Sequence, residues 1–169
     1  MKGAKGLRRG ERSAGSVLIG KGRSVSKGRA VGEALVSRQA ISFYGGVDAR
    51  TGEVIERGHE LEGRSVKERI LVFPRGRGST VGSYIIYGLA SNRVAPLALV
   101  NEQTETIVAT GAILAGIPCV DGIDLTGIRS GDILEVDADR GTVKRLGPQT
   151  ARWSRRSTPA RGRETGRRR

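Results

Sequence analysis

Hydrophobic and polar positions divide the chain into short strand-like and helix-like segments. Alternation of apolar and polar residues predicts strands, and so do short apolar runs rich in β-branched and aromatic residues. The last two predicted strands, 133–137 and 141–145, are expected to form a hairpin. Apolar side chains at three- and four-residue spacing predict helices over 81–92 and 105–115, the second stopped by Gly116 and Pro118. The predicted strands cover residues 28–37, 40–44, 53–56, 69–73, 96–100, 133–137 and 141–145.

The first predicted helix follows a glycine-rich segment. We expect Ser79 or Thr80 to be its N-cap, because a short hydroxyl side chain can accept the free N–H groups of a first helical turn. Together the elements predict a glycine-rich mixed β/α domain with two main helices. The spacing within the first helix also predicts that five side chains lie near one face: Val81, Tyr84, Ile85, Tyr87 and Leu89.

Positive charge is concentrated at the two ends of the chain. The 169 residues carry a net charge of +13, but the ends, 1–29 and 151–169, hold +8 and +7, and the middle holds −2. The ends are also rich in Gly, Ser, Arg and Pro, and such segments cannot bury enough apolar surface to fold. We therefore expect three parts: a basic, flexible arm over 1–27, a single folded domain over 28–147 with Ser16 as its alternative start, and a disordered arginine-rich tail over 148–169.

Composition and cysteine content exclude several classes of protein. No apolar run approaches the roughly 18 residues that a membrane helix needs, and no apolar segment follows the basic start to make a secretory signal. The single cysteine, Cys119, excludes a disulfide framework and a self-contained zinc or iron–sulfur site. We therefore expect a cytoplasmic protein. The basic ends, with Trp153 able to stack on a base, are the only support for an RNA-associated protein.

A glycine-rich loop separates the expected strand at 69–73 from the first helix. Its sequence is Arg75-Gly-Arg-Gly-Ser-Thr80. The first N–H groups of a helix and its dipole favour an anion at this place, and the two glycines let the backbone approach a ligand closely. The two arginines add forked donors for a carboxylate or phosphate. The loop therefore predicts an anion site, although it lacks the Lys-Ser/Thr pair of a nucleotide P-loop.

Several motifs occur in order over residues 28–137: Gly32-Glu-Ala-Leu-Val-Ser37, Ile41-Ser-Phe-Tyr-Gly-Gly-Val-Asp48, Phe73-Pro-Arg-Gly-Arg-Gly-Ser-Thr-Val-Gly-Ser83, Ala95-Pro96 and Gly111-Ala-Ile-Leu-Ala-Gly-Ile-Pro118. Together they resemble the swivel domain of the aconitase X family. The resemblance implies the swivelling β/β/α fold of aconitases, and a domain that is either fused to a large catalytic subunit or separate from it. For a chain with one cysteine it implies a small subunit in a heterodimer, whose large subunit ligates the iron–sulfur cluster, of the 4Fe-4S type.

The family resemblance also implies a hydro-lyase activity that needs the large subunit. Archaeal two-subunit members convert (R)-5-phosphomevalonate to trans-anhydromevalonate 5-phosphate in a mevalonate pathway to isoprenoids, and bacterial members dehydrate cis-3-hydroxy-L-proline. The run Ser79-Thr-Val-Gly-Ser-Tyr-Ile-Ile-Tyr87 is similar to the archaeal kind. We therefore expect the phosphomevalonate reaction, with the hydroxyproline reaction as the alternative. A stand-alone domain that binds a small molecule is a third hypothesis.

Residue roles follow from the same resemblance. Ser79 matches the swivel-loop serine that takes the substrate's α-proton; Thr80 is the fallback, and a plain N-cap is the alternative for Ser79. We expect His59 to face solvent and Cys119 to be a buried small side chain rather than a ligand. Lys21 and Arg23 could reach a substrate phosphate only if the N-terminal arm becomes ordered. The expected substrate-binding residues are Arg75, Gly76, Arg77, Gly78, Thr80, Gly45 and Gly46; Asp48 helps to shape the cleft, and a simple turn is the alternative for Gly45, Gly46 and Asp48.

Overall fold

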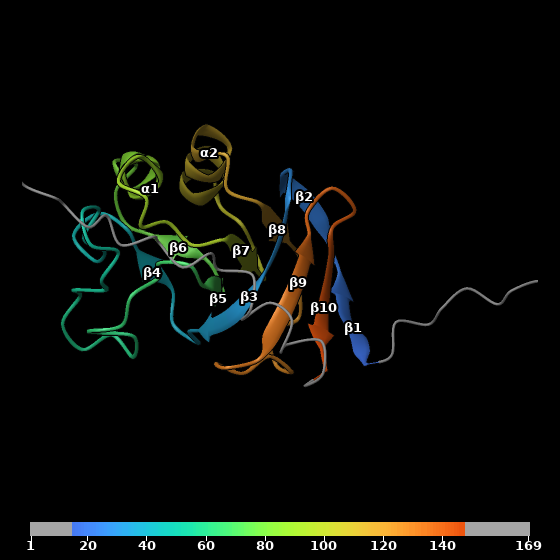
Figure 1. Ribbon diagram of the computed structural model, residues 1–169. Helices are drawn as coiled ribbons and strands as arrows, with labels where there is room; N and C mark the ends of the chain where they lie inside the picture. Colours follow the sequence, from blue (N-terminus) through green and yellow to red (C-terminus); the bar gives the residue numbers. More distant parts are fainter. Residues whose placement is uncertain (1–14, 148–169) are drawn as a thin grey trace, which may run out of the picture.

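One eight-stranded sheet organises residues 15–147, which are the residues that the computed structural model describes (Figure 1). Its strand order is β1-β10-β9-β3-β5-β7-β8-β2, and a separate two-stranded sheet pairs β4 with β6. The elements are β1 (Ser16–Lys21), β2 (Arg23–Ser26), β3 (Arg29–Val36), β4 (Ile41–Ser42), β5 (Ile70–Phe73), β6 (Gly76–Arg77), α1 (Gly82–Ser91), β7 (Ala98–Asn101), α2 (Thr106–Ala115), β8 (Cys119–Asp121), β9 (Ile133–Asp137) and β10 (Thr142–Leu146).

The sheet closes on itself at Gly22. β1 and β2 are consecutive in the chain yet occupy the two edges of the sheet, where β1 pairs with β10 and β2 with β8, both antiparallel. The N–H of Gly22 donates to the carbonyl of Gly141 at 2.8 Å. A Cβ at Gly22 would lie 1.8 Å from the carbonyl oxygen of Asp121, so only glycine fits where the two edges meet.

The position of β1 and β2 corrects the expected domain boundary. Residues 16–26 belong to the folded domain, so its start lies at the alternative, Ser16, rather than at Gly28. Composition misplaced the boundary because these strands are held by main-chain pairing to β10 and β8, and their own side chains bury little apolar surface. The rest of the expected arm, 1–14, and the tail, 148–169, lie outside the described residues.

The parallel strands β3, β5, β7 and β8 separate two hydrophobic cores. Within β5, Leu71 and Phe73 point to the side covered by α1 and α2, and Ile70 and Val72 point into the closed sheet. Burial on both faces explains why β5 and β7, unlike β3, are short, almost wholly apolar runs. The core inside the closed sheet is completed by side chains of β9, β10 and the segment between β8 and β9, such as Leu134, Val143 and Ile123.

Within the predicted domain, 28–147, most of the predicted elements are confirmed, with four differences. The strand expected over 40–44 shortens to β4, and the one expected over 53–56 is replaced by the isolated bridges Val47–Val54 and Glu53–Ser65. β6 and β8 were not expected, because each is too short for an alternation pattern to be visible. The α/β class, with a mixed sheet and two helices, is as predicted.

The two helices pack closely because glycine lies at their crossing. A Cβ at Gly111 in α2 would lie 2.7 to 3.2 Å from three atoms of the Ile86 side chain in α1. Both helices also lie on the same side of the sheet (Figure 1). The face predicted for α1 is wrong in part, because Ile86 and Leu89 are buried whereas Val81, Tyr84 and Tyr87 are exposed.

Substitution of Gly111 tests this crossing. Gly111→Ala is expected to lower the free energy of unfolding by about 1–3 kcal/mol, since overpacking outweighs alanine's better helix propensity. Gly88→Ala in α1 is the matched control, because its added methyl would meet only the Ala49 methyl, at 3.3 Å. Its effect should stay within about 1 kcal/mol. Urea unfolding of both variants measures the difference, and a stabilised Gly111→Ala protein would contradict the close crossing.

Candidate functional site

The loop from Arg75 to Thr80 lies on the open surface between β5 and α1. Its residues are exposed except for Gly76, which pairs through β6 with Ile41 of β4. A Cβ at Gly76 would lie 2.4 Å from Oε1 of Glu105 and 2.6 Å from a methyl of Val108. The loop therefore rests directly on the start of α2, where the Glu105 carboxylate accepts the N–H groups of Ile107 and Val108.

Gly78 adopts a backbone conformation that favours glycine. Its φ is +92°, and a Cβ there would lie 2.6 Å from the hydroxyl of Ser42. That hydroxyl donates to the carbonyl of Tyr44 at 3.0 Å. The second glycine thus lets the loop turn away from β6 while it stays packed against β4.

Ser79 is exposed and lies just before α1. Its Oγ accepts the N–H of Val81 at 3.2 Å, and its carbonyl accepts the N–H of Gly82 at 2.9 Å. Val81, rather than Ser79 or Thr80, has the N-cap position of α1, so the predicted cap is wrong by one or two residues. The Ser79 hydroxyl oxygen thus accepts one hydrogen bond, from Val81. Its own proton is donated to no acceptor among residues 15–147.

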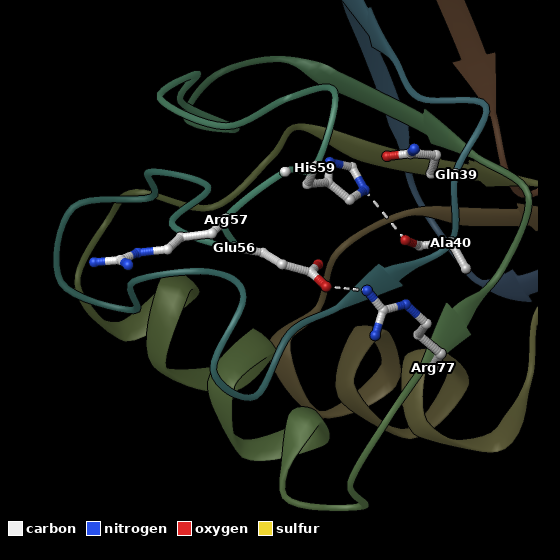
Figure 2. Close-up of a pocket in the computed structure, with 7 residues that line it drawn as sticks. Gln39, Ala40, Glu56, Arg57, His59 and Arg77 are labelled. Carbon is white, nitrogen blue, oxygen red and sulfur yellow. Dashed lines mark hydrogen bonds and ion pairs between the residues drawn. The ribbon is translucent and has the colours of Figure 1, made fainter.

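The two arginines of the loop differ in their partners. Arg77 forms an ion pair with Glu56, as Figure 2 shows. The exposed guanidinium of Arg75 makes no ion pair or hydrogen bond to another described residue. Because Glu56 offsets the charge of Arg77, the free positive charge in the loop comes from Arg75.

A cavity of about 300 Å³ lies beside the ion pair and is the one drawn in Figure 2. His59 on its wall is only 7% exposed, so the expectation that it faces solvent is wrong. Its Nδ1 accepts the N–H of Leu61 at 3.1 Å, and its Nε2 lies 3.2 Å from the carbonyl of Ala40, to which it donates. Both ring nitrogens are therefore used in holding the loop. The lining residues are Gln39, Ala40, Glu56, Arg57, Gly58, His59 and Arg77.

Gly45 and Gly46 form a tight turn after β4 that adjoins the same cavity wall. Gly45 is exposed with φ +79°, and a Cβ at Gly46 would lie 2.0 Å from the Ser42 carbonyl oxygen and 3.4 Å from Oε2 of Glu56. The carbonyl of Gly46 accepts the N–H of Ile55 at 2.9 Å. The turn therefore helps to place Glu56 opposite Arg77. Its contacts are those of a tight turn, and substrate binding by Gly45, Gly46 and Asp48 stays a prediction.

A buried carboxylate that the sequence analysis missed lies at the end of β8. Asp121 accepts the N–H of Thr104 at 2.5 Å and Nε of Arg23 at 3.1 Å, and it forms an ion pair with Arg23. Burial raises the pKa of Asp121, but these hydrogen bonds and the Arg23 charge hold it below its usual range. The sequence feature that could have identified Asp121 is its position directly after a short apolar run. Arg23, expected on a flexible arm, is held in β2 by this pairing.

Cys119 is a buried side chain, as expected. It is fully inaccessible to solvent, and burial raises the pKa of its thiol to about 12. Within residues 15–147, no group of three or more His, Cys, Asp or Glu side chains could hold a metal ion. The described part of this chain therefore offers no ligand set for an iron–sulfur cluster. Neither helix in that part has the length and apolar character needed to span a bilayer.

Comparisons with known proteins agree with this architecture. The sequence model of the family described as "Aconitase X swivel domain" matches residues 19–145. The phosphomevalonate dehydratase small subunit of Thermococcus sibiricus is 61% identical over 123 residues, which cover 73% of this chain and 95% of that protein. The corresponding small subunit of Methanocaldococcus jannaschii is 54% identical over 126 residues, covering 75% and 96%. This chain belongs to the aconitase X swivel-domain family.

A solved structure matches in the same way. The crystal structure of Thermococcus kodakaraensis aconitase X, in its holo-form, superposes with a TM-score of 0.74 at 51% identity, and the match covers 76% of this chain and 97% of that one. The family model begins at residue 19 and ends at residue 145, so residues 1–18 and 146–169 lie outside the match, whereas residues 19–29 of the first basic end lie inside it. The fold and family predicted from the sequence are confirmed.

The buried Asp121 carboxylate, paired with the exposed guanidinium of Arg23, makes stability depend on pH. The folded-state pKa of Asp121 is lowered, so the pair stabilises the protein above the unfolded-state pKa of about 3.9, and this contribution is lost as pH falls through the folded value. Asp121→Asn should lower the free energy of unfolding by about 1–3 kcal/mol near pH 7. The difference from wild type should shrink below about pH 4, where the wild-type carboxylate also loses its charge.

Denaturant unfolding at several pH values measures this difference. Asp124→Asn is a matched control at an exposed aspartate nearby, and its effect near neutral pH should be smaller. If the free energy of unfolding of Asp121→Asn stays below that of wild type by the same amount down to the lowest pH, the ion pair is not the cause of the difference.

Proposed function

We propose that this chain is the small subunit of a two-subunit phosphomevalonate dehydratase, a hydro-lyase. Its reaction converts (R)-5-phosphomevalonate to trans-anhydromevalonate 5-phosphate. The observation that carries the proposal is the exposed Ser79 hydroxyl in front of α1, in a chain 61% identical to a small subunit of that name along 95% of its length. The relatives named in this way come from archaea such as Thermococcus and Methanocaldococcus.

In this reaction Ser79 is the base that removes the α-proton of the substrate. A serine hydroxyl is a poor base in water, so it must lie where a developing alkoxide is stabilised. The N–H of Val81, which Ser79 Oγ already accepts, and the start of α1 supply a positive field at that oxygen. Arg75, free of a carboxylate partner among the described residues, orients the carboxylate or phosphate of the substrate.

The proposal requires a large subunit that brings the metal centre. Cys119 is buried, so we propose that an iron–sulfur cluster of the 4Fe-4S type is ligated by that partner in a heterodimer. When bound, the cluster supplies a Lewis acid for departure of the substrate hydroxyl. This chain contributes the base, the anion-binding groups and one wall of the reaction site. We place the enzyme in the cytoplasm on the ground of this metabolic role.

Substitution of Ser79 tests the base. Ser79→Ala, assembled with the large subunit, should form the heterodimer normally and lose about 10²–10⁴-fold in kcat on phosphomevalonate. Ser91→Ala, an exposed serine at the far end of α1, is the matched control and should keep wild-type turnover. Thr80→Ala separates the fallback base from Ser79. If Ser79→Ala keeps a near wild-type kcat, Ser79 is not the base.

Substitution of the loop arginines tests substrate binding. Arg75→Gln should raise the KM for phosphomevalonate by about 10–100-fold, the value of a lost charge-assisted hydrogen bond, with a smaller change in kcat. Arg77→Gln should raise it less, because Glu56 already pairs with Arg77. Arg140→Gln, in the turn between β9 and β10, is the control. Steady-state kinetics of each variant is measured on phosphomevalonate and on cis-3-hydroxy-L-proline. A preference of the wild-type enzyme for cis-3-hydroxy-L-proline would overturn the assigned reaction.

A further inference from the structure

The two helices have an unusual composition for surface helices. Neither α1 nor α2 contains a charged residue, although 28% of the chain is charged. Each helix packs one apolar side on the core, through residues such as Ile86 and Leu89 of α1 and Val108 of α2. A surface helix normally presents polar and charged residues on its other side, and one that is apolar all round is normally covered.

The uncovered side of the helices is apolar and aromatic. We call it the outer helical face and define it as Val81, Tyr84, Tyr87, Ile113 and Leu114, all exposed. Tyr84 is 71% exposed and Leu114 is 57% exposed, and both line one groove, so the two helices form a continuous surface. Tyrosines on a surface without charges are typical of the centre of a protein–protein interface.

The groove connects this face to the reactive loop. It has a volume of about 330 Å³ and lies between the N-terminal half of α1 and α2, along which its lining extends from Thr106 to Leu114. Thr80, the residue next to Ser79, is part of its lining. The lining residues are Thr80, Ser83, Tyr84, Thr106, Ile107, Thr110 and Leu114.

We infer that the outer helical face is the surface on which the large subunit docks, an inference that rests on the proposed function. Ser79 is open to solvent and can act only on a substrate held against it, so the subunit that carries the metal centre must cover the Ser79 loop. The groove continues from that loop, and the same subunit therefore extends over it. The partner's contact surface is apolar and uncharged, with hydrogen-bond acceptors for the tyrosine hydroxyls at its rim.

A second copy of this chain does not fit the same place in a working enzyme. A copy seated on the groove would cover the Ser79 loop and exclude both substrate and metal centre.

The exposed apolar pair on β1, Val17 and Leu18, is a weaker candidate for the docking surface. These two residues lie opposite Arg145 and Lys144 of β10, so charge adjoins them, and β1 lies at the far side of the molecule from the helices (Figure 1).

The exposed leucines provide a matched pair of variants. Leu114→Arg places a charge on the outer helical face, and Leu18→Arg makes the same change at a leucine that is also 57% exposed. Purified chain is titrated calorimetrically against the large subunit from the same genome, and thermal melts of each free variant confirm the fold. Leu114→Arg should weaken the dissociation constant by at least about 30-fold, the effect of losing one interface hot spot. Tyr84→Arg on α1 should do the same, and Leu18→Arg should bind as wild type.

The outcomes separate this inference from the proposed function. If Leu114→Arg and Tyr84→Arg both bind the large subunit as tightly as wild type, the docking surface is elsewhere, whatever the activity of the wild-type pair. If they lose binding but the wild-type pair does not dehydrate phosphomevalonate, the surface stands and the assigned reaction falls. Sedimentation of the chain alone tests the other occupant, since a wild-type dimer that Leu114→Arg dissociates would assign the face to self-association and overturn the inference.

Discussion

The contact between Gly76 and Glu105 joins the fold to the reactive loop. The Glu105 carboxylate caps α2 and occupies the space that a side chain at position 76 would need. Because of this contact, the start of α2 and the glycine loop cannot move independently. α2 in turn packs against α1 through Gly111 and Ile86. The loop is therefore supported by α2, on which Gly76 rests, and by α1, which follows it in the chain. A reactive group on a loop needs such support to hold its geometry.

Local patterns in the sequence predicted the elements that are held by local chemistry. β3, β5, β7, both helices and the β9–β10 hairpin have clear periodicity and turn residues, and the structure confirms them. β1 and β2 could not be found in this way, because their stability comes from strands more than a hundred residues and about ninety residues away in the chain. The outer side of α1 was misread for a related reason. Periodicity shows which apolar residues share a face of a helix, but it does not show which face packs on the core of the domain.

The same distinction applies to the site. The loop from Arg75 to Thr80 could be located from its residues, because glycines, arginines and a hydroxyl before a helix have a direct physical meaning. Glu56, Glu105 and Asp121 could not be assigned, since their roles depend on Arg77, Gly76 and Arg23, which are neighbours only in the folded chain. His59 was misjudged because its polar sequence neighbours conceal two hydrogen bonds to loop backbone.

The solvent exposure of Ser79 links assembly to catalysis. In the free chain, water surrounds the Ser79 loop and weakens the field that the start of α1 and Arg75 exert on the hydroxyl. A subunit that docks on the outer helical face removes this water, and the same charges then act in a medium of lower dielectric constant. In the mechanism that we propose, the Ser79 base therefore becomes effective only when the large subunit is in place. If the large subunit docks where we propose, its binding and the activation of Ser79 are a single event.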